Sequence, residues 1–155
     1  MRLLFFVIDD IQYAVRSDAV AEIIRAVAIR PLPNAPAVIE GIIDVRGRIA
    51  PVFDLRLRFG RASRAVKASD HFILVRASAR LAALHVDRVL DMIDVDDTAV
   101  DPMGEQVANV SYIAGVALLP DGMALIHDVD TFLSAAEADT LSAALEASAG
   151  ADRAR

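Results

Sequence analysis

Short apolar runs separated by turn residues fill most of the chain and predict strands rather than long helices. An apolar run at residues 3–8 is followed by Asp9-Asp10, and residues 11–15 then alternate between apolar and polar side chains. Such alternation is typical of a strand with one buried face, so the two runs are predicted to form a β-hairpin. Comparable strand patterns recur at residues 80–85 and 88–93.

A second hairpin is predicted between residues 39 and 55. Two β-rich runs flank the pair Arg46-Gly47, where a two-residue or bulged turn needs a residue with a positive φ angle. Glycine adopts that conformation without steric cost. Arg46 is therefore expected at the tip of a rigid hairpin.

This hairpin has a copy in the second half of the chain. Residues 39–42 match residues 113–116, and residues 50–55 match residues 124–129, each displaced by 74 positions, as from Gly41 to Gly115 (115 − 41). Weaker sequence similarity relates residues 4–7 to residues 71–74 and residues 20–24 to residues 86–90. The chain is therefore predicted to be internally duplicated. About five short strands in each half are enough for a small closed barrel that leaves few bare edges.

The predicted fold is mainly β, with two small five-stranded barrels related by internal duplication, short helices and a C-terminal helix. Ser134 and Glu137 have capping-box spacing, which predicts the start of that helix. The helix is expected to pack on its own barrel. The predicted organisation is one domain at residues 1–149, with subdomains at about 1–62 and 68–130, the helix at about 134–148 and a flexible tail at 150–155.

Composition narrows the class of function. The 155 residues, of which 55% are hydrophobic, suffice for one globular domain with a buried core. A net charge of −6 argues against nucleic acid as a partner, because phosphate binding needs a basic surface. No apolar run approaches the roughly 20 residues of a membrane-spanning helix, and neither an export signal nor a cysteine is present, so we expect a cytoplasmic protein without membrane insertion.

Candidate chemistry is sparse. The three histidines, His71, His85 and His127, are scattered on predicted strands, and no metal, phosphate or nucleophile motif accompanies them. No enzymatic activity, metal or cofactor is therefore expected. A local basic cluster is expected to be a set of solvated surface side chains; its members are Arg46, Arg48, Arg56, Arg58, Arg61 and Arg64.

One alternative class is a phospho-accepting receiver domain. Asp9, Asp10 and Asp54 each follow an apolar run, as the acidic residues of a receiver do. A receiver needs a helix after its first strand, whereas the next segment alternates like a strand, and the chain has no lysine in its later part. Asp54 also has a copy, Asp128, which favours a structural role at the end of each hairpin.

Four segments resemble the chemotaxis coupling protein (CheW-like) family: residues 20–23 (VAEI), 36–41 (PAVIEG), 44–47 (DVRG) and 51–56 (PVFDLR), with residues 112–116 and 125–128 in agreement. The resemblance implies a non-enzymatic adaptor of two SH3-like barrels. Its implied partners are the cytoplasmic helical hairpin of chemoreceptors and the regulatory domain of a CheA-type histidine kinase, at membrane receptor arrays. The alternative within this fold is a twin-barrel regulatory protein that binds only the kinase.

The resemblance also implies partner-binding positions. Val20, Glu22, Gly41 and Arg46 match positions that the family uses in coupling, with Arg46 foremost; its alternative role is a surface arginine paired within the fold. Gly41 is expected to act partly through structure, because its copy is also glycine. Glu22 corresponds to Arg88 in the second copy, which favours a partner role for its charge.

Three further residues complete the predicted site. Asp44 and Val45 stand where the family commonly has asparagine and leucine, and the acid beside Arg46 is expected to shift the charge preference for partners. Val20, Val45 and Val86 are expected to be exposed at barrel edges and to supply the apolar part of the interface.

Overall fold

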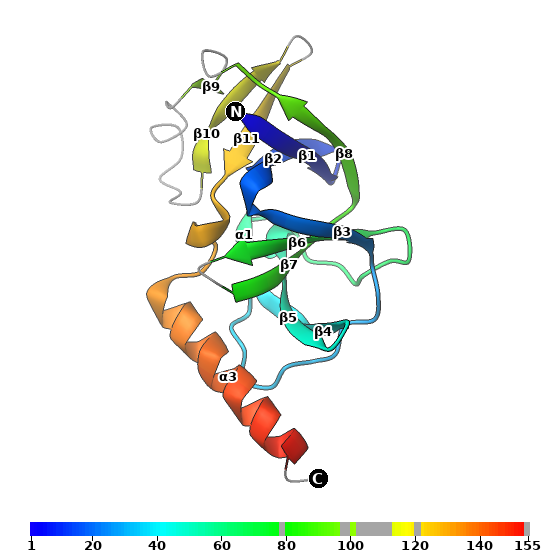
Figure 1. Cartoon of the computed structure of the whole chain (residues 1–155), viewed down its shortest axis with the longest axis vertical. Coiled ribbons are helices and arrows are strands. Elements are labelled where there is room, and N and C mark those ends of the chain that lie inside the picture. Colours follow the sequence, from blue (N-terminus) through cyan, green and yellow to red (C-terminus); the bar gives the residue numbers. More distant parts are fainter. Residues whose placement is uncertain (78–79, 97–99, 102–112, 120–121, 154–155) are drawn as a thin grey trace.

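The computed structural model describes residues 1–77, 80–96, 100–101, 113–119 and 122–153 of the chain. Two β-sheets follow one another along the long axis of the molecule, and a C-terminal helix descends beside the lower one (Figure 1). The strands are β1 (Arg2–Ile8), β2 (Ile11–Arg16), β3 (Val20–Arg25), β4 (Ile39–Val45), β5 (Arg48–Phe53), β6 (His71–Ala77), β7 (Arg80–Val86), β8 (Arg88–Asp94), β9 (Val100–Asp101), β10 (Ile113–Leu119) and β11 (Gly122–His127). The helices are α1 (Leu55–Arg58), α3 (Ala135–Arg153) and the 3-10 turns η1 (Ser17–Ala19) and η3 (Val129–Thr131).

The two sheets share one plan. The upper sheet has the strand order β8-β1-β2-β11-β10-β9, and the lower sheet has the order β3-β6-β7-β5-β4. In each, a central antiparallel hairpin joins a second hairpin through one parallel contact, β2 with β11 above and β7 with β5 below. The short β9 is the only addition to five long strands among the described residues. The predicted mainly β fold with two matching units, short helices and a C-terminal helix is confirmed.

The sheets do not follow the predicted division at residues 1–62 and 68–130. The hairpin β1–β2 from the first half lies in the upper sheet with β8, β10 and β11, and β6–β7 from the second half completes the lower sheet with β3, β4 and β5. The two halves therefore exchange hairpins reciprocally. Sequence comparison could not show this, because an alternating pattern identifies a strand but not its hydrogen-bonded neighbour.

Strand pairing also corrects the alignment between the two copies for the segments whose sequence similarity is weaker. Phe53 pairs with Leu84 in the lower sheet, and its copy His127 pairs with Val15 in the upper sheet. Leu84 is thus the counterpart of Val15, a displacement of 69 (84 − 15). The same displacement relates β3 to β8, since each carries a bulge at the matching place. The counterpart of Glu22 is therefore Asp91, and the prediction of Arg88 was wrong.

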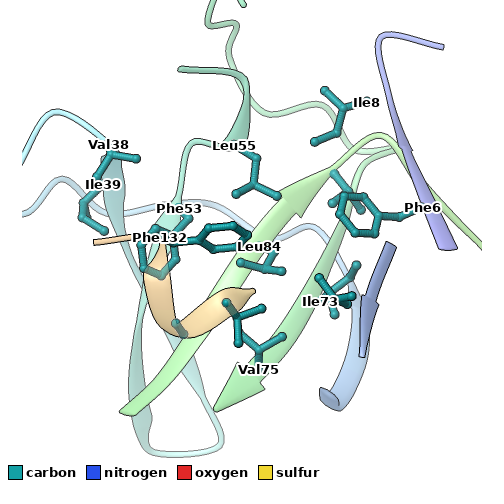
Figure 2. Close-up of a cluster of buried hydrophobic side chains, with 14 of the residues drawn as sticks. Phe6, Ile8, Val38, Ile39, Phe53, Leu55, Ile73, Val75, Leu84 and Phe132 are labelled. Atoms are coloured by element: carbon teal, nitrogen blue, oxygen red, sulfur yellow. The ribbon is translucent and has the colours of Figure 1, made fainter. Parts of the chain in front are cut away.

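Three groups of buried side chains hold the fold together. One lies inside the upper barrel and one inside the lower barrel. The largest, here called the shared core, joins the two sheets and includes Phe6, Tyr13, Ile73 and Leu84. Figure 2 shows Phe6 and Ile8 on one side of this core, with Ile73, Val75, Leu84 and Phe132 facing them. Each sheet therefore buries one face in its own barrel and the other against its neighbour.

The C-terminal helix begins where the capping box predicted. The amide of Ser134 donates to Glu137 Oε1 at 2.9 Å, and the amide of Glu137 donates to Ser134 Oγ at 3.1 Å. Leu141 and Ala144 are buried in the shared core, so the helix packs on its own domain. It continues to Arg153 rather than ending near residue 148, because a single glycine costs a helix only about 1 kcal/mol relative to alanine. The residues predicted as a tail are thus helical up to Arg153.

The segment 94–108 is rich in acidic residues. Its residues 100–101 form β9, which pairs with β10, and residues 97–99 and 102–108 lie outside the described residues. Residues 120–121, between β10 and β11, also lie outside them. No helix in the described ranges is long and apolar enough to cross a membrane.

Truncation of Leu141 tests whether α3 is part of the folded core. The Leu141 side chain is 0% exposed, so Leu141→Ala is expected to leave a cavity and to lower the free energy of unfolding by about 2–5 kcal/mol in urea denaturation. Met123→Ala is the control, because Met123 is 66% exposed and should change stability by less than about 0.5 kcal/mol. Equal effects of the two substitutions would contradict the docking of α3.

Candidate partner-binding site

The β4–β5 hairpin presents Arg46 as the sequence predicted. Val45 pairs with Arg48, so the turn has two residues, and both adopt positive φ angles, 51° for Arg46 and 83° for Gly47. This is the type I′ turn that matches the twist of flanking strands. Asp44 Oδ1 accepts a hydrogen bond from the Gly47 amide at 2.7 Å. The acid beside Arg46 therefore has a structural part in holding the turn that displays the arginine.

Arg46 binds Glu22, so the structure brings together two of the predicted site residues. Arg46 Nη1 lies 3.1 Å from Glu22 Oε1, and Nη2 contacts Oε2, which makes the pair bidentate. The hydrogen bond from Arg46 lowers the pKa of Glu22, and the same bond raises the pKa of Arg46. The Arg46 side chain is nevertheless 73% exposed, and that of Glu22 is 36% exposed. Both members of the pair are accessible from solvent.

The Glu22–Arg46 pair also marks the closure of the lower barrel. Glu22 belongs to β3 and Arg46 follows β4, and these two strands lie at opposite ends of the lower sheet. They can meet only because the sheet curls round on itself. A backbone bridge between Arg30 and Ile42 seals the same seam, with hydrogen bonds of 2.9 and 2.8 Å.

Gly41 has a structural role at this seam. It is buried, and a Cβ atom at this position would lie 2.2 Å from the carbonyl oxygen of Arg30. Glu40 is the extra residue of a bulge between Ile39 and Gly41, and the copy has a bulge between Ile113 and Gly115. The glycine thus permits a close approach of two backbone segments, and its effect on partners is expected to be indirect.

The expectation that Val45 and Val86 are exposed was wrong. Val45 is 8% exposed because it points into the lower barrel between the outward-facing Asp44 and Arg46. Val86 is 0% exposed because β7 is a central strand covered on both faces, where burial is continuous rather than alternating. Val20 is half-buried against the shared core.

Exposed apolar side chains occur instead at other positions of the strands. Ile23 on β3 is 40% exposed next to Glu22, and its counterpart Met92 on β8 is 39% exposed. Ile49 on β5, just beyond the turn that carries Arg46, is 51% exposed. The burial of β3 alternates although its sequence does not, and because Ile23 and Ile24 are both apolar the sequence could not show which of them is exposed. Sequence reasoning missed these residues because it could not place β3 and β8 at the sheet edges.

The arginines after the hairpin are not a solvated cluster. Arg56 is 2% exposed, with Nε 3.3 Å from Asp9 Oδ1 and Nη2 bonded to Asp87 Oδ1. Arg64 binds the same Asp87 oxygen at 2.6 Å. Two further pairs extend the set, Arg61 with Asp9 and Arg58 with Glu137. These ion pairs connect α1, the β1–β2 turn, the end of β7 and α3, so their role is to join elements of both sheets.

Two of the acidic residues that suggested a receiver domain, Asp9 and Asp54, have structural partners. β1 is followed by the strand β2 and not by a helix. Asp54 Oδ1 accepts from the Leu57 amide at 3.1 Å and caps α1, and Asp128 Oδ1 accepts from the Asp130 amide at 3.0 Å and caps η3. The matched caps confirm the structural interpretation. In the ranges that the structure describes, no three His, Cys, Asp or Glu side chains form a set that could hold a metal ion.

Comparison with known proteins identifies the fold and the family together. Residues 2–137 match the family model described as the CheW-like domain. The chain belongs to the CheW-like family. The scaffolding protein TtCheW of Thermoanaerobacter tengcongensis has a crystal structure that superposes with a TM-score of 0.80 at 29% identity, covering 88% of this chain and 94% of that one. The SH3-like twin-barrel fold and the family resemblance are confirmed.

Curated relatives agree with this membership. The chemotaxis protein CheW of Helicobacter pylori is 26% identical over 136 residues, 86% of this chain and 81% of that protein. CheW of Rhizobium meliloti is 27% identical over 137 residues, 87% and 88% of the two chains. The protein FrzA of Myxococcus xanthus is 28% identical over 113 residues, 72% and 70%. The CheW family comprises chemotaxis scaffold proteins and is not known for enzymatic activity.

Substitution of Gly41 separates structural from direct effects at the seam. Gly41→Ala is expected to lower the free energy of unfolding by more than about 2 kcal/mol, because the added methyl group collides with backbone rather than with a flexible side chain. The matched control is Gly47→Asn, since nothing lies within 4 Å of the Gly47 Cβ position and asparagine tolerates positive φ. Thermal denaturation of both variants gives the comparison, and an equally mild loss in both would refute the close-approach argument.

Proposed function

We propose that this protein is a non-enzymatic adaptor that couples methyl-accepting chemoreceptors to a CheA-type histidine kinase in the cytoplasm, at membrane receptor arrays. Membership of a chemotaxis scaffold family supports the adaptor role. The observation that carries the site assignment is the exposed, bidentate pair of Glu22 and Arg46 at the closure of the lower barrel.

The pair is suited to exchange with a partner. Exposed ion pairs contribute only about 0–1 kcal/mol to stability, so opening this one costs the fold little. Guanidinium binds carboxylates bidentately, and a tight turn already fixes the backbone that carries Arg46. A carboxylate on a receptor helix or on the kinase can therefore replace Glu22 with small loss, and Glu22 is then released to accept a basic group.

Apolar contacts complete the proposed interface. Interfaces combine an apolar centre with a polar rim, and the exposed large apolar side chains nearest to the pair in sequence are Ile23 on β3 and Ile49 on β5. We assign the apolar contribution to these two residues in place of Val45 and Val86. Each contact is expected to be modest in affinity, and assembly in arrays strengthens it because linked sites gain effective concentration.

Exchange of the charges of Glu22 and Arg46 distinguishes a contact of Arg46 with the partner from a role that is limited to the ion pair within the protein. Arg46→Glu is expected to weaken binding to a receptor cytoplasmic hairpin or to the kinase regulatory domain by about tenfold or more, because it breaks the pair and reverses the displayed charge. Glu22→Arg combined with Arg46→Glu restores an internal pair with the charges reversed. Binding should stay weak in this double variant if Arg46 contacts the partner. Dissociation constants measured by calorimetry give the comparison.

The neighbouring Arg48 supplies a matched control. It is exposed on the same hairpin, so Arg48→Glu makes the same charge change one position beyond the turn and should alter binding much less. If the double variant binds like the wild type, the pair acts within the fold and the assignment of Arg46 fails.

Reconstitution with both partners tests the adaptor role itself. A coupler forms a ternary complex with the receptor hairpin and the kinase regulatory domain, and gel filtration of the three components should show it. The alternative twin-barrel regulator binds the kinase domain alone, so a binary complex that excludes the receptor would favour it. Absence of binding to either partner would refute both.

A further inference from the structure

His85 lies between two carboxylates in the interior of the protein. Its side chain is 2% exposed on β7. Nδ1 lies 2.9 and 3.1 Å from the two carboxylate oxygens of Glu40, and Nε2 lies 2.7 Å from Oδ2 of Asp70. The ring of Phe72 meets the imidazole edge-on at 5.6 Å. Sequence reasoning treated this histidine as an ordinary strand residue.

Hydrogen-bond chemistry sets the charge of this ring. A neutral imidazole has one donor and one acceptor nitrogen, whereas ionised carboxylates only accept. Two simultaneous contacts with carboxylates therefore require the imidazolium form. Burial lowers the pKa of His85, but the hydrogen bonds and negative charges of Glu40 and Asp70 outweigh it, so the pKa is raised above its ordinary value.

The charged groups around His85 form a continuous chain. Asp70 also receives two hydrogen bonds from Arg64, at 2.7 and 2.8 Å, and one from the Lys67 amide at 2.9 Å. Arg64 then contacts Asp87 at 2.6 Å, which also binds Arg56. Burial raises the pKa of Asp70, but the hydrogen bonds from Arg64 and His85 have the larger, opposite effect, so the pKa lies below its ordinary value. Among the side chains of this chain of charged groups, His85 is the one whose ordinary pKa, about 6.5, lies nearest to neutral pH.

The location of Glu40 connects this ring to the partner-binding hairpin. Glu40 is the bulged residue at the base of β4, one position before Gly41, and Arg46 lies at the far end of the same hairpin. Strand pairing gives the equivalent positions in the upper sheet. His85 corresponds to Arg16, Asp70 to Met1 and Glu40 to Ala114. An equivalent barrel thus forms without this arrangement, so the fold as such does not require it.

We propose that cationic His85 is a positioning residue that clamps Glu40, and through it the base of the β4–β5 hairpin, to β7 and the start of β6. The clamp fixes the strand that carries Arg46 without contacting any partner. This role of the clamp rests on the proposed function in one respect: Arg46 is taken to be the residue that the hairpin presents to a partner. Loss of the proton removes one of the two hydrogen bonds and leaves a buried carboxylate with a weaker partner.

The pH dependence follows from the direction of the pKa shift. A histidine whose pKa is higher in the folded state than in the unfolded state contributes its stability fully below the unfolded value, about 6.5. That contribution is lost as the pH rises through the folded-state value. The clamp is therefore expected to be closed below about pH 6.5 and to open as the pH rises through the folded-state pKa of His85.

Titration of the ring protons by NMR, on the full chain alone, tests the charge of His85. The expected result is an apparent pKa above the ordinary value of about 6.5, and Glu40→Gln should lower it, because the amide keeps an acceptor oxygen but no charge. His71→Gln, a histidine at the start of β6, is the assignment control. A wild-type His85 that titrates at or below 6.5 would overturn the proposal.

Hydrogen exchange at one fixed pH near 7 tests the positioning role. Glu40→Gln and His85→Gln should speed exchange of the β4–β5 amides by about tenfold relative to the wild type, while the β1–β2 amides change little. If His85→Gln does not fold, Glu40→Gln carries the test. Unchanged exchange in β4–β5 would overturn the positioning role. Neither measurement involves a receptor or kinase, so failure of the proposed function leaves both results interpretable.

Discussion

The reciprocal exchange of hairpins between the two halves is the constraint on which the rest of the structure depends. Each sheet has a central hairpin from one half and its remaining long strands from the other, joined by the parallel contacts of β2 with β11 and β7 with β5. The central hairpins also supply half of the buried residues of the shared core between the sheets. Neither half can therefore complete a sheet, or cover both faces of its strands, without the other.

The exchange also determines where the candidate site lies. Because the exchanged hairpin occupies the middle of the lower sheet, β3 and β4 become its edges, and curling of the sheet brings those edges together. Glu22 and Arg46 meet at this seam, and Gly41 lets the segment at Arg30 approach closely enough to seal it. The candidate binding residues Glu22 and Arg46 lie far apart in the sequence and are neighbours because the lower barrel closes.

The sequence predicted features whose signals lie within a few residues of one another. The turn at Arg46-Gly47, the capping box of α3 and the duplicated hairpin with its glycine and aspartate all belong to this class. The features it missed depend on long-range neighbours. Burial of Val86 follows from the central place of β7, and burial of Arg56 follows from Asp9 and Asp87, which are distant in sequence. Edge strands could not be recognised before strand order was known, so the exposed apolar residues were assigned to wrong positions.

Comparison of the two copies, aligned by strand pairing, separates what a barrel needs from what this protein adds. Glycines at the bulge and aspartate caps after the hairpin occur in both copies and are explained by backbone geometry and helix termini. Glu22 now belongs with the shared features, because its counterpart Asp91 is also acidic. Arg46, Glu40 and His85 have no chemical equivalent in the other copy. Because the matching upper sheet forms without them, the fold itself does not require these residues, and the proposed display of Arg46 to a partner offers a reason for their presence in the lower barrel.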